Sequence, residues 1–182
     1  MRSKLSIAGH PLHPMLVTIP IGLFVWTFFA SLIYAIGDRE DTWYAIAQWS
    51  GVAAIVTAAL AAVAGFVDYL TIVPGSNARS LATGHMALNV VVLALFLVAW
   101  LYMRNDGARD GSELALVIAL QGIGVALLSV SGWIGGEMVY RHHLAIVPHD
   151  REHEGAERAI HRPRHEEDGQ SHIARPLEKP RT

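Results

Sequence analysis

Four long stretches of the chain are almost entirely apolar, and short polar segments separate them. The stretches cover residues 11–36, 43–73, 81–103 and 114–140. Each exceeds the roughly 20 mostly apolar residues that a helix needs to cross the hydrocarbon core of a bilayer. None shows the alternation of apolar and polar residues that is typical of a half-buried strand. The pattern therefore predicts four transmembrane helices.

The three connections between these stretches are short and rich in residues that favour turns. They cover residues 37–42, 74–77 and 105–111. Helices that are joined by short connections lie antiparallel beside each other. We therefore predict an all-α membrane protein, in which residues 1–147 form an up-down-up-down four-helix transmembrane bundle. The sequence shows no convincing internal repeat.

Charged residues are concentrated outside the predicted helices. Only 16% of the 182 residues are charged and 52% are hydrophobic, whereas an ordinary soluble domain has about 25% charged residues. Residues 148–182 alone hold seven of the 14 Lys and Arg residues and eight of the 16 Asp and Glu residues. This segment has too few large apolar side chains to offset the entropy that is lost on folding. We predict that it is a polar, His-rich and mostly disordered C-terminal tail.

The composition excludes several classes of protein. The chain has no cysteine, which excludes a disulfide scaffold, an iron–sulfur cluster and a zinc site with thiolate ligands. Its net charge of −2 gives no basis for nucleic-acid binding. The first apolar stretch is longer than the roughly 7–15 apolar residues of a signal peptide, so we interpret it as a membrane helix. The lipid bilayer is therefore the expected surrounding of residues 1–147.

Lys and Arg residues near the helix ends predict the orientation in the membrane. One side has more of them than the other: Arg2, Lys4, Arg79, Arg141 and those of the tail, against Arg39, Arg104 and Arg109. The side that is richer in Lys and Arg usually faces the cytoplasm. We expect a multi-pass protein of the bacterial inner membrane with both termini in the cytoplasm.

The antiparallel layout brings the polar residues of the predicted bundle to one end. They are His10, His13, Asp68, His85, Asn89, Glu137, Arg141, His142 and His143. Ionisable residues inside a membrane span are costly, and they tend to mark a function. Because His10 and His13 are three residues apart at the predicted helix start, both rings can point to one side. We therefore take this end of the bundle as the candidate site.

Structural interpretations of these residues stay open at this point. His10 and His13 can cap a helix at the level of the lipid headgroups, and Asp68 can form an ion pair with Arg79 or Arg141. Glu137 and Arg141 are four residues apart, which is the spacing of an ordinary ion pair on a helix surface.

Two further features concern the shapes of individual helices. Gly132, Gly135 and Gly136 in the fourth helix can allow close helix packing or leave room for a flat cofactor. Pro20 lies inside the first helix and should kink it, because proline removes a helical hydrogen bond.

Four motifs at this end of the bundle carry a family resemblance. They are Gly9-His10-Pro11-Leu12-His13-Pro14, Gly65-Phe66-Val67-Asp68-Tyr69, His85-Met86-Ala87-Leu88-Asn89 and the segment from Ser131 to His142. Together they resemble a bacterial membrane family known as domain of unknown function 2231, over roughly residues 5–147. The family pattern usually has glycine after its final histidine, where this chain has His143, so His142 is the motif histidine.

The resemblance implies the four-helix topology and a setting in electron transfer. Some members of the family look fused to a Rieske iron–sulfur domain, which by analogy implies membrane electron transfer. This chain lacks that domain and the cysteines that it needs, so an iron–sulfur partner would be a separate subunit.

The first functional hypothesis is a small b-type cytochrome. Two of His13, His85 and His142 would hold one haem b from different helices. Gly132, Gly135 and Gly136 would admit the porphyrin, and Arg141 or Arg79 would meet a propionate. Such a subunit would exchange electrons with a quinone or with a redox partner subunit.

The second hypothesis is a non-haem metal site, and the third has no cofactor. The metal ligands would come from His10, His13, Asp68, His85, Asn89, Glu137 and His142. This set lacks thiolate and suits iron, zinc or copper(II). Without a cofactor, the polar residues would form a proton relay or the seam of a scaffold subunit. The sequence does not decide whether the chain is an enzyme or forms a homo-oligomer.

All hypotheses that include a metal make one structural prediction. His13, Asp68, His85 and His142 should converge in one pocket.

Overall fold

The computed structural model describes residues 6–7, 10–104 and 107–142. Its elements are β1 (Ser6–Ile7), β2 (His10–Pro11), α1 (Leu12–Leu16), α2 (Thr18–Ile36), α3 (Asp41–Tyr69), α4 (Asn77–Met103) and α5 (Gly111–His142). The predicted tail, residues 148–182, lies outside the described residues.

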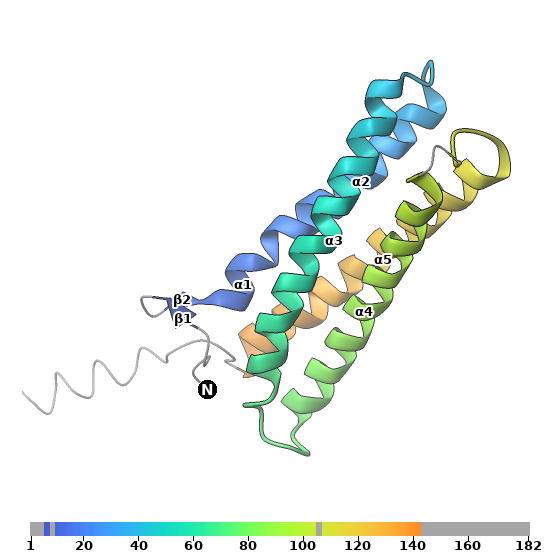
Figure 1. Cartoon of the computed structure of the whole chain (residues 1–182). Helices are drawn as coiled ribbons and strands as arrows, with labels where there is room; N and C mark the ends of the chain where they lie inside the picture. Colours follow the sequence, from blue (N-terminus) through green and yellow to red (C-terminus); the bar gives the residue numbers. More distant parts are fainter. Residues whose placement is uncertain (1–5, 8–9, 105–106, 143–182) are drawn as a thin grey trace, which may run out of the picture. The chain divides into compact units, whose positions relative to one another are not determined.

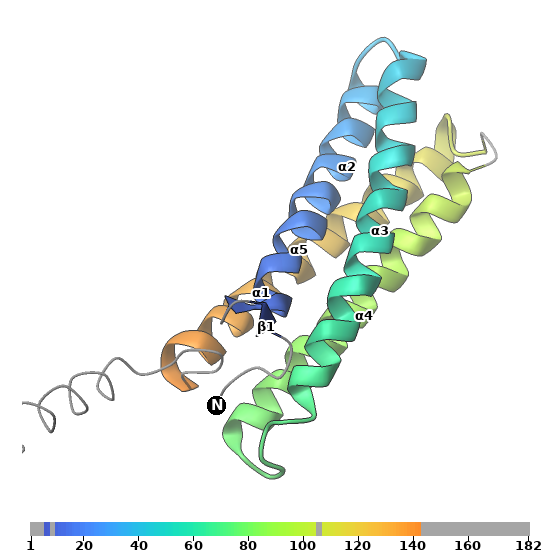
Figure 2. The same cartoon turned by 60° about the vertical axis from the view of Figure 1, so that its left-hand side comes forward.

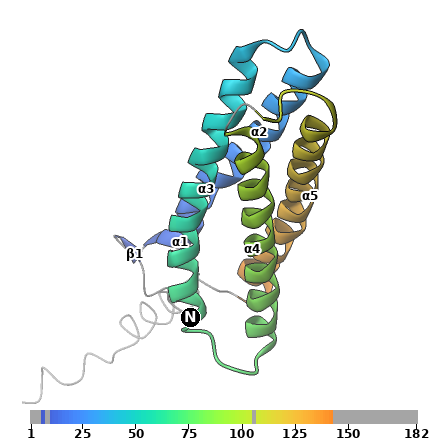
Figure 3. The ribbon, with the colours of Figure 1, turned by 45° about the vertical axis from the view of Figure 1, so that its right-hand side comes forward.

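The long helices form two helical hairpins that pack into one bundle. α2 packs most extensively against α3, and α4 packs most extensively against α5 (Figure 1). α2 also contacts α5, and α3 contacts α4 (Figures 2 and 3). The four helices therefore form a closed ring, in which α2 and α4 lie diagonally opposite each other. This arrangement confirms the predicted up-down-up-down four-helix bundle.

The outside of the bundle is apolar enough to face lipid. Four helical runs have the length and composition of membrane spans: Leu12–Ile36, Asp41–Tyr69, Asn77–Met103 and Gly111–Arg141. Large apolar side chains point outward from them, and Trp49, Val63 and Trp133 are 72%, 66% and 79% exposed. Contiguous apolar surface of this kind is rare on soluble monomers.

The first span is interrupted close to Pro20. α1 ends at Leu16, and Val17 separates it from α2. Proline has no N–H, so position 20 cannot donate the helical hydrogen bond to the Leu16 carbonyl. The backbone remains nearly continuous, because Val17 donates to the His13 carbonyl and Ile21 donates to the Val17 carbonyl. The kink expected from the sequence is therefore a break between two helices.

His10 lies just before the first helix, as the predicted helix start at residue 11 implies. It belongs to β2, which pairs antiparallel with β1 so that His10 is opposite Ile7. A residue before proline is biased towards extended backbone, and Pro11 itself is extended, with φ −68° and ψ 130°. The backbone of His10 therefore has a strand conformation, and helical spacing does not relate it to His13.

The two helix limits at the α3–α4 connection both lie earlier in the chain than the sequence predicts. α3 ends at Tyr69 and not near residue 73, whereas α4 begins at Asn77 and not near residue 81. The Ser76 hydroxyl caps α4 by accepting a hydrogen bond from the Arg79 backbone N–H at 3.2 Å. The Arg79 guanidinium donates to the Tyr69 and Ile72 carbonyls at the end of α3. These contacts satisfy backbone groups that helix ends leave unpaired.

Two clusters of buried apolar side chains fill the bundle. One lies near the α2–α3 and α4–α5 connections and includes Tyr34, Tyr44, Met103 and Val117. The other lies further along the helices and consists of Phe24, Ala54, Val92, Phe96 and Leu128. The rings of Phe24 and Phe96 are 4.3 Å apart between their centres.

Candidate functional site

Two of the predicted histidines face each other across the bundle. His13 lies on α1 and His85 on α4, so they come from different helical hairpins. Their ring centres are 6.5 Å apart, and their ring planes are nearly perpendicular, at 88°. Both side chains are half-buried. The antiparallel layout thus brings together two imidazoles that are far apart in the sequence.

α3 holds the ring of His13. Its Nδ1 lies 3.0 Å from the carbonyl oxygen of Ala61. Gly65 lies one turn later on the same face of α3, and a Cβ there would be 2.7 Å from Cε1 and 2.8 Å from Nδ1 of the ring. Glycine at position 65 therefore lets the imidazole approach the α3 backbone. We refer to His13, Ala61 and Gly65 as the His13 half.

α5 holds the ring of His85 in the same way. Its Nδ1 lies 2.9 Å from the carbonyl oxygen of Ser131 and 3.0 Å from the Ser131 Oγ. Gly135 lies one turn after Ser131, and a Cβ there would be 3.3 Å from Cε1 of the ring. Each hairpin therefore places a histidine against a carbonyl and a glycine four residues apart on its second helix.

Asn89 adds a polar side chain next to His85. It lies one turn later on α4, and its Nδ2 is 2.6 Å from the Ser131 Oγ and 2.8 Å from the His85 carbonyl oxygen. The same Nδ2 is 3.2 Å from Nε2 of His85. The corresponding position after His13 is the apolar Val17. We refer to His85, Asn89, Ser131 and Gly135 as the His85 half.

The hydrogen bonds indicate which ring nitrogens carry a proton. A backbone carbonyl only accepts hydrogen bonds, so Nδ1 of both histidines must be the donor. In a neutral imidazole, Nε2 then carries a lone pair. Histidines that bind a metal almost always donate their other ring N–H to a carbonyl, a carboxylate or water. Both rings therefore carry a lone pair on Nε2, and in His85 this lone pair faces the Asn89 Nδ2 at 3.2 Å.

The other ionisable residues of the prediction do not join the pair in a metal-binding group. Among the described side chains, no three His, Asp or Glu residues lie close enough to hold one metal ion. Asp68 and Glu137 are half-buried, and His10 is exposed on β2. The side chain of His142 lies outside the described ones. Among the described side chains, the structure therefore shows His13 and His85 together, but no group of three that could hold a metal ion.

The arginines have separate partners. The Arg141 Nε lies 2.9 Å from the Glu137 Oε1, and the Arg141 side chain is 75% exposed. Arg79 caps α3, and its guanidinium lies 3.5 Å from the centre of the Tyr69 ring. Arg141 is therefore the more accessible of the two arginines that were considered for a propionate.

The three predicted glycines of α5 differ in their surroundings. Gly135 packs against the His85 ring, as described above. A Cβ at Gly132 or at Gly136 would meet no atom within 4 Å. Gly132 is exposed, so the open space beside it is the outer surface of the bundle, whereas Gly136 is half-buried.

Sequence reasoning missed the partners that hold the two rings. Gly65 and Ser131 stand in the motifs that carry the family resemblance, but neither was considered as a site residue. Ala61 contributes only its backbone carbonyl, so its side chain carries no signal that could have identified it.

The residues of the His13 half and the His85 half lie within a stretch of the chain that matches a known family. Residues 9–148 match the family described as predicted membrane protein, DUF2231. The chain belongs to the DUF2231 family. With its four candidate spans, this DUF2231 chain is a multi-pass membrane protein. No curated protein and no solved structure matches it.

Proposed function

We propose that this DUF2231 protein is a membrane electron-transfer subunit that binds one haem b between His13 and His85. The observation that carries the proposal is the pair of facing imidazoles from two hairpins. Each ring is bonded through Nδ1 to a backbone carbonyl of its own hairpin, at 3.0 Å and 2.9 Å. Histidine pairs in helical bundles are common axial ligands of haem iron.

The distance between the rings supports a shared ligand. A bond between a metal and an imidazole nitrogen is about 2.0–2.1 Å long. The His13 and His85 ring centres lie 6.5 Å apart, which is close to the separation that two imidazoles holding one metal ion would have.

The number of protein ligands also favours haem over a non-haem metal. A haem can be held by as few as one or two histidines, since the porphyrin supplies four of the iron ligands. Zinc sites take three or four ligands from the protein, and the described side chains bring no third His, Asp or Glu residue to the pair. Two facing histidines meet the requirement of haem and not that of a closed metal site.

The surroundings of the pair fit a flat cofactor. The half-buried Gly136 has no atom within 4 Å of where a Cβ would lie, and the exposed Arg141 is suited to a propionate. A bound haem would supply a one-electron redox centre. The chain would hold the haem through His13 and His85. The carbonyls of Ala61 and Ser131 would orient these two imidazoles.

The setting follows from the proposed haem and from the charges at the helix ends. A single haem at one end of the bundle exchanges electrons with a quinone or with a separate redox subunit. The excess of Lys and Arg on the same side supports an inner-membrane protein whose haem lies towards the cytoplasm.

Optical spectroscopy of the detergent-solubilised full chain tests the proposal. We expect a Soret band that shifts on reduction with dithionite, and we expect His13→Ala and His85→Ala to abolish it. His10→Ala is the matched control, because His10 is exposed on β2, and it should leave the spectrum unchanged. A colourless preparation without iron, from cells supplied with a haem precursor, would contradict the proposal.

A further inference from the structure

Further polar side chains lie in the half of the bundle opposite the histidines. We call the set of Ser31, Gln48, Trp100, Met103 and Gln121 the glutamine layer, and its members come from all four long helices. The Gln48 Nε2 donates to the Met103 carbonyl at 3.1 Å, and the Gln121 Nε2 lies 3.8 Å from the Met103 Sδ. Ser31 lies between Ala30 and Tyr34, which belong to the same buried cluster as Met103.

Several polar atoms of this layer have no protein partner. Among the described residues, the Ser31 Oγ, the Trp100 Nε1 and the Gln121 Oε1 are buried without a hydrogen bond. The side chains of Ser31 and Gln121 are each 1% exposed. The Gln121 amide has only the Met103 sulfur, which is a weak acceptor. At the depth of a membrane span, no lipid atom can replace the missing partners, so leaving them unpaired is costly.

We propose that the glutamine layer is a binding site for ordered water. A water molecule can donate to the Gln121 Oε1 and accept from the Trp100 N–H or the Ser31 hydroxyl, and buried waters typically make about three hydrogen bonds. The layer therefore offers both kinds of partner that water needs. It holds no charged side chain, which distinguishes it from an ion site.

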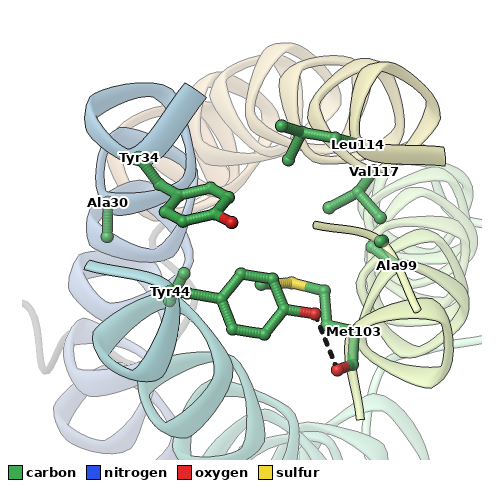
Figure 4. Close-up of a cluster of buried hydrophobic side chains, with 9 residues drawn as sticks. Ala30, Tyr34, Tyr44, Ala99, Met103, Leu114 and Val117 are labelled. Carbon is green, nitrogen blue, oxygen red and sulfur yellow. Dashed lines mark hydrogen bonds between the residues drawn. The ribbon is translucent and has the colours of Figure 1, made fainter. Parts of the chain in front are cut away.

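The walls of the layer favour a guest as small as water. Ala30, Ala47 and Ala99 belong to the same buried cluster as Met103 and are 0%, 1% and 0% exposed. Figure 4 shows Tyr34 and Tyr44 reaching inward from α2 and α3, with Met103 across from them on α4. The Tyr44 hydroxyl donates to the Met103 carbonyl at 2.8 Å, which closes this side. A larger polar molecule would have to displace several fully buried side chains.

An apolar layer separates this water site from the histidine pair. On every helix, a member of the Phe24, Ala54, Val92, Phe96 and Leu128 cluster lies between the two polar regions. The bound water therefore belongs to the half of the bundle that carries the α2–α3 connection. The inference does not depend on the proposed haem.

Magnetic resonance of the isotope-labelled full chain in detergent tests the site directly. We expect a cross-peak between the Gln121 side-chain amide protons and a long-lived water molecule. This measurement needs no variant. The absence of that cross-peak, or a cross-peak to an organic guest in its place, would overturn the assignment.

Thermal unfolding gives a second test, in which the sign of the change decides. If water is the partner of Gln121, then Gln121→Leu should lower the melting temperature by roughly 2–6 °C. If the amide is unpaired, the same substitution should raise it. Ser31→Ala is the companion variant, because a shared water makes the loss in the double variant smaller than the sum of the two single losses. A raised melting temperature, or strict additivity, would contradict a shared water.

Discussion

The two halves of the histidine pair follow one plan but are held by different forces. Each ring bonds to a carbonyl and packs against a glycine on the second helix of its own hairpin. In the His13 half, a Cβ at the glycine would lie 2.7 Å from the ring, compared with 3.3 Å in the His85 half. The His85 half compensates with polar contacts from Ser131 and Asn89, where the chain has Val17 after His13. Close packing positions one ring, and a hydrogen-bond network positions the other.

Gly65→Ala should have the largest effect, because it acts on the half that depends on close packing. The new Cβ would overlap the ring of His13, which cannot move away without losing its bond to Ala61. We expect the free energy of unfolding in detergent to fall by about 1–3 kcal/mol. Chemical denaturation of the purified chain measures it.

Gly132→Ala is the matched control for this substitution, since a Cβ there meets no atom within 4 Å. It should be neutral or stabilising, because alanine favours a helix over glycine by about 1 kcal/mol. If both substitutions had the same effect, the His13 half would not depend on close packing.

Asn89→Leu should have an intermediate effect, because it acts on the half that depends on hydrogen bonds. It removes the donor to the Ser131 Oγ and to the His85 carbonyl, and it leaves the Ser131 hydroxyl without that partner. We expect the free energy of unfolding to fall by about 1–2 kcal/mol. Val17→Asn, at the corresponding position of the His13 half, is denatured alongside it for comparison. A loss no larger than that of an ordinary surface substitution would show that the network does not hold His85.

Gly135→Ala should have the smallest effect of the three. At 3.3 Å from a new Cβ, the His85 ring needs to move by only a few tenths of an ångström. The gain in helix propensity offsets most of that strain, so we expect a change within about 1 kcal/mol of zero. Measured together with Gly65→Ala, it tests the comparison directly, and an order of effects opposite to this one would refute it.

Some residues of the site could be recognised from the neighbouring sequence alone, and others could not. His85 and Asn89 were recognisable together, since both lie inside an apolar span and one turn apart. His10 lies on the short strand β2, where Pro11 and the strand pair set the backbone, so helical spacing does not apply there. Ala61 could not be recognised, because it contributes a carbonyl that any residue has.

The number of spans, their approximate limits and their antiparallel order follow from the sequence, because burial in lipid requires long apolar segments and short connections leave little choice of direction. The sequence also identifies His13 and His85 as polar groups at one end of the bundle. Only the tertiary structure decides that the two rings face each other, that glycines at positions 65 and 135 receive them, and that both hairpins repeat this plan. The reason is that the rotation of each helix about its axis depends on the packing between helices, and hydropathy alone does not determine it.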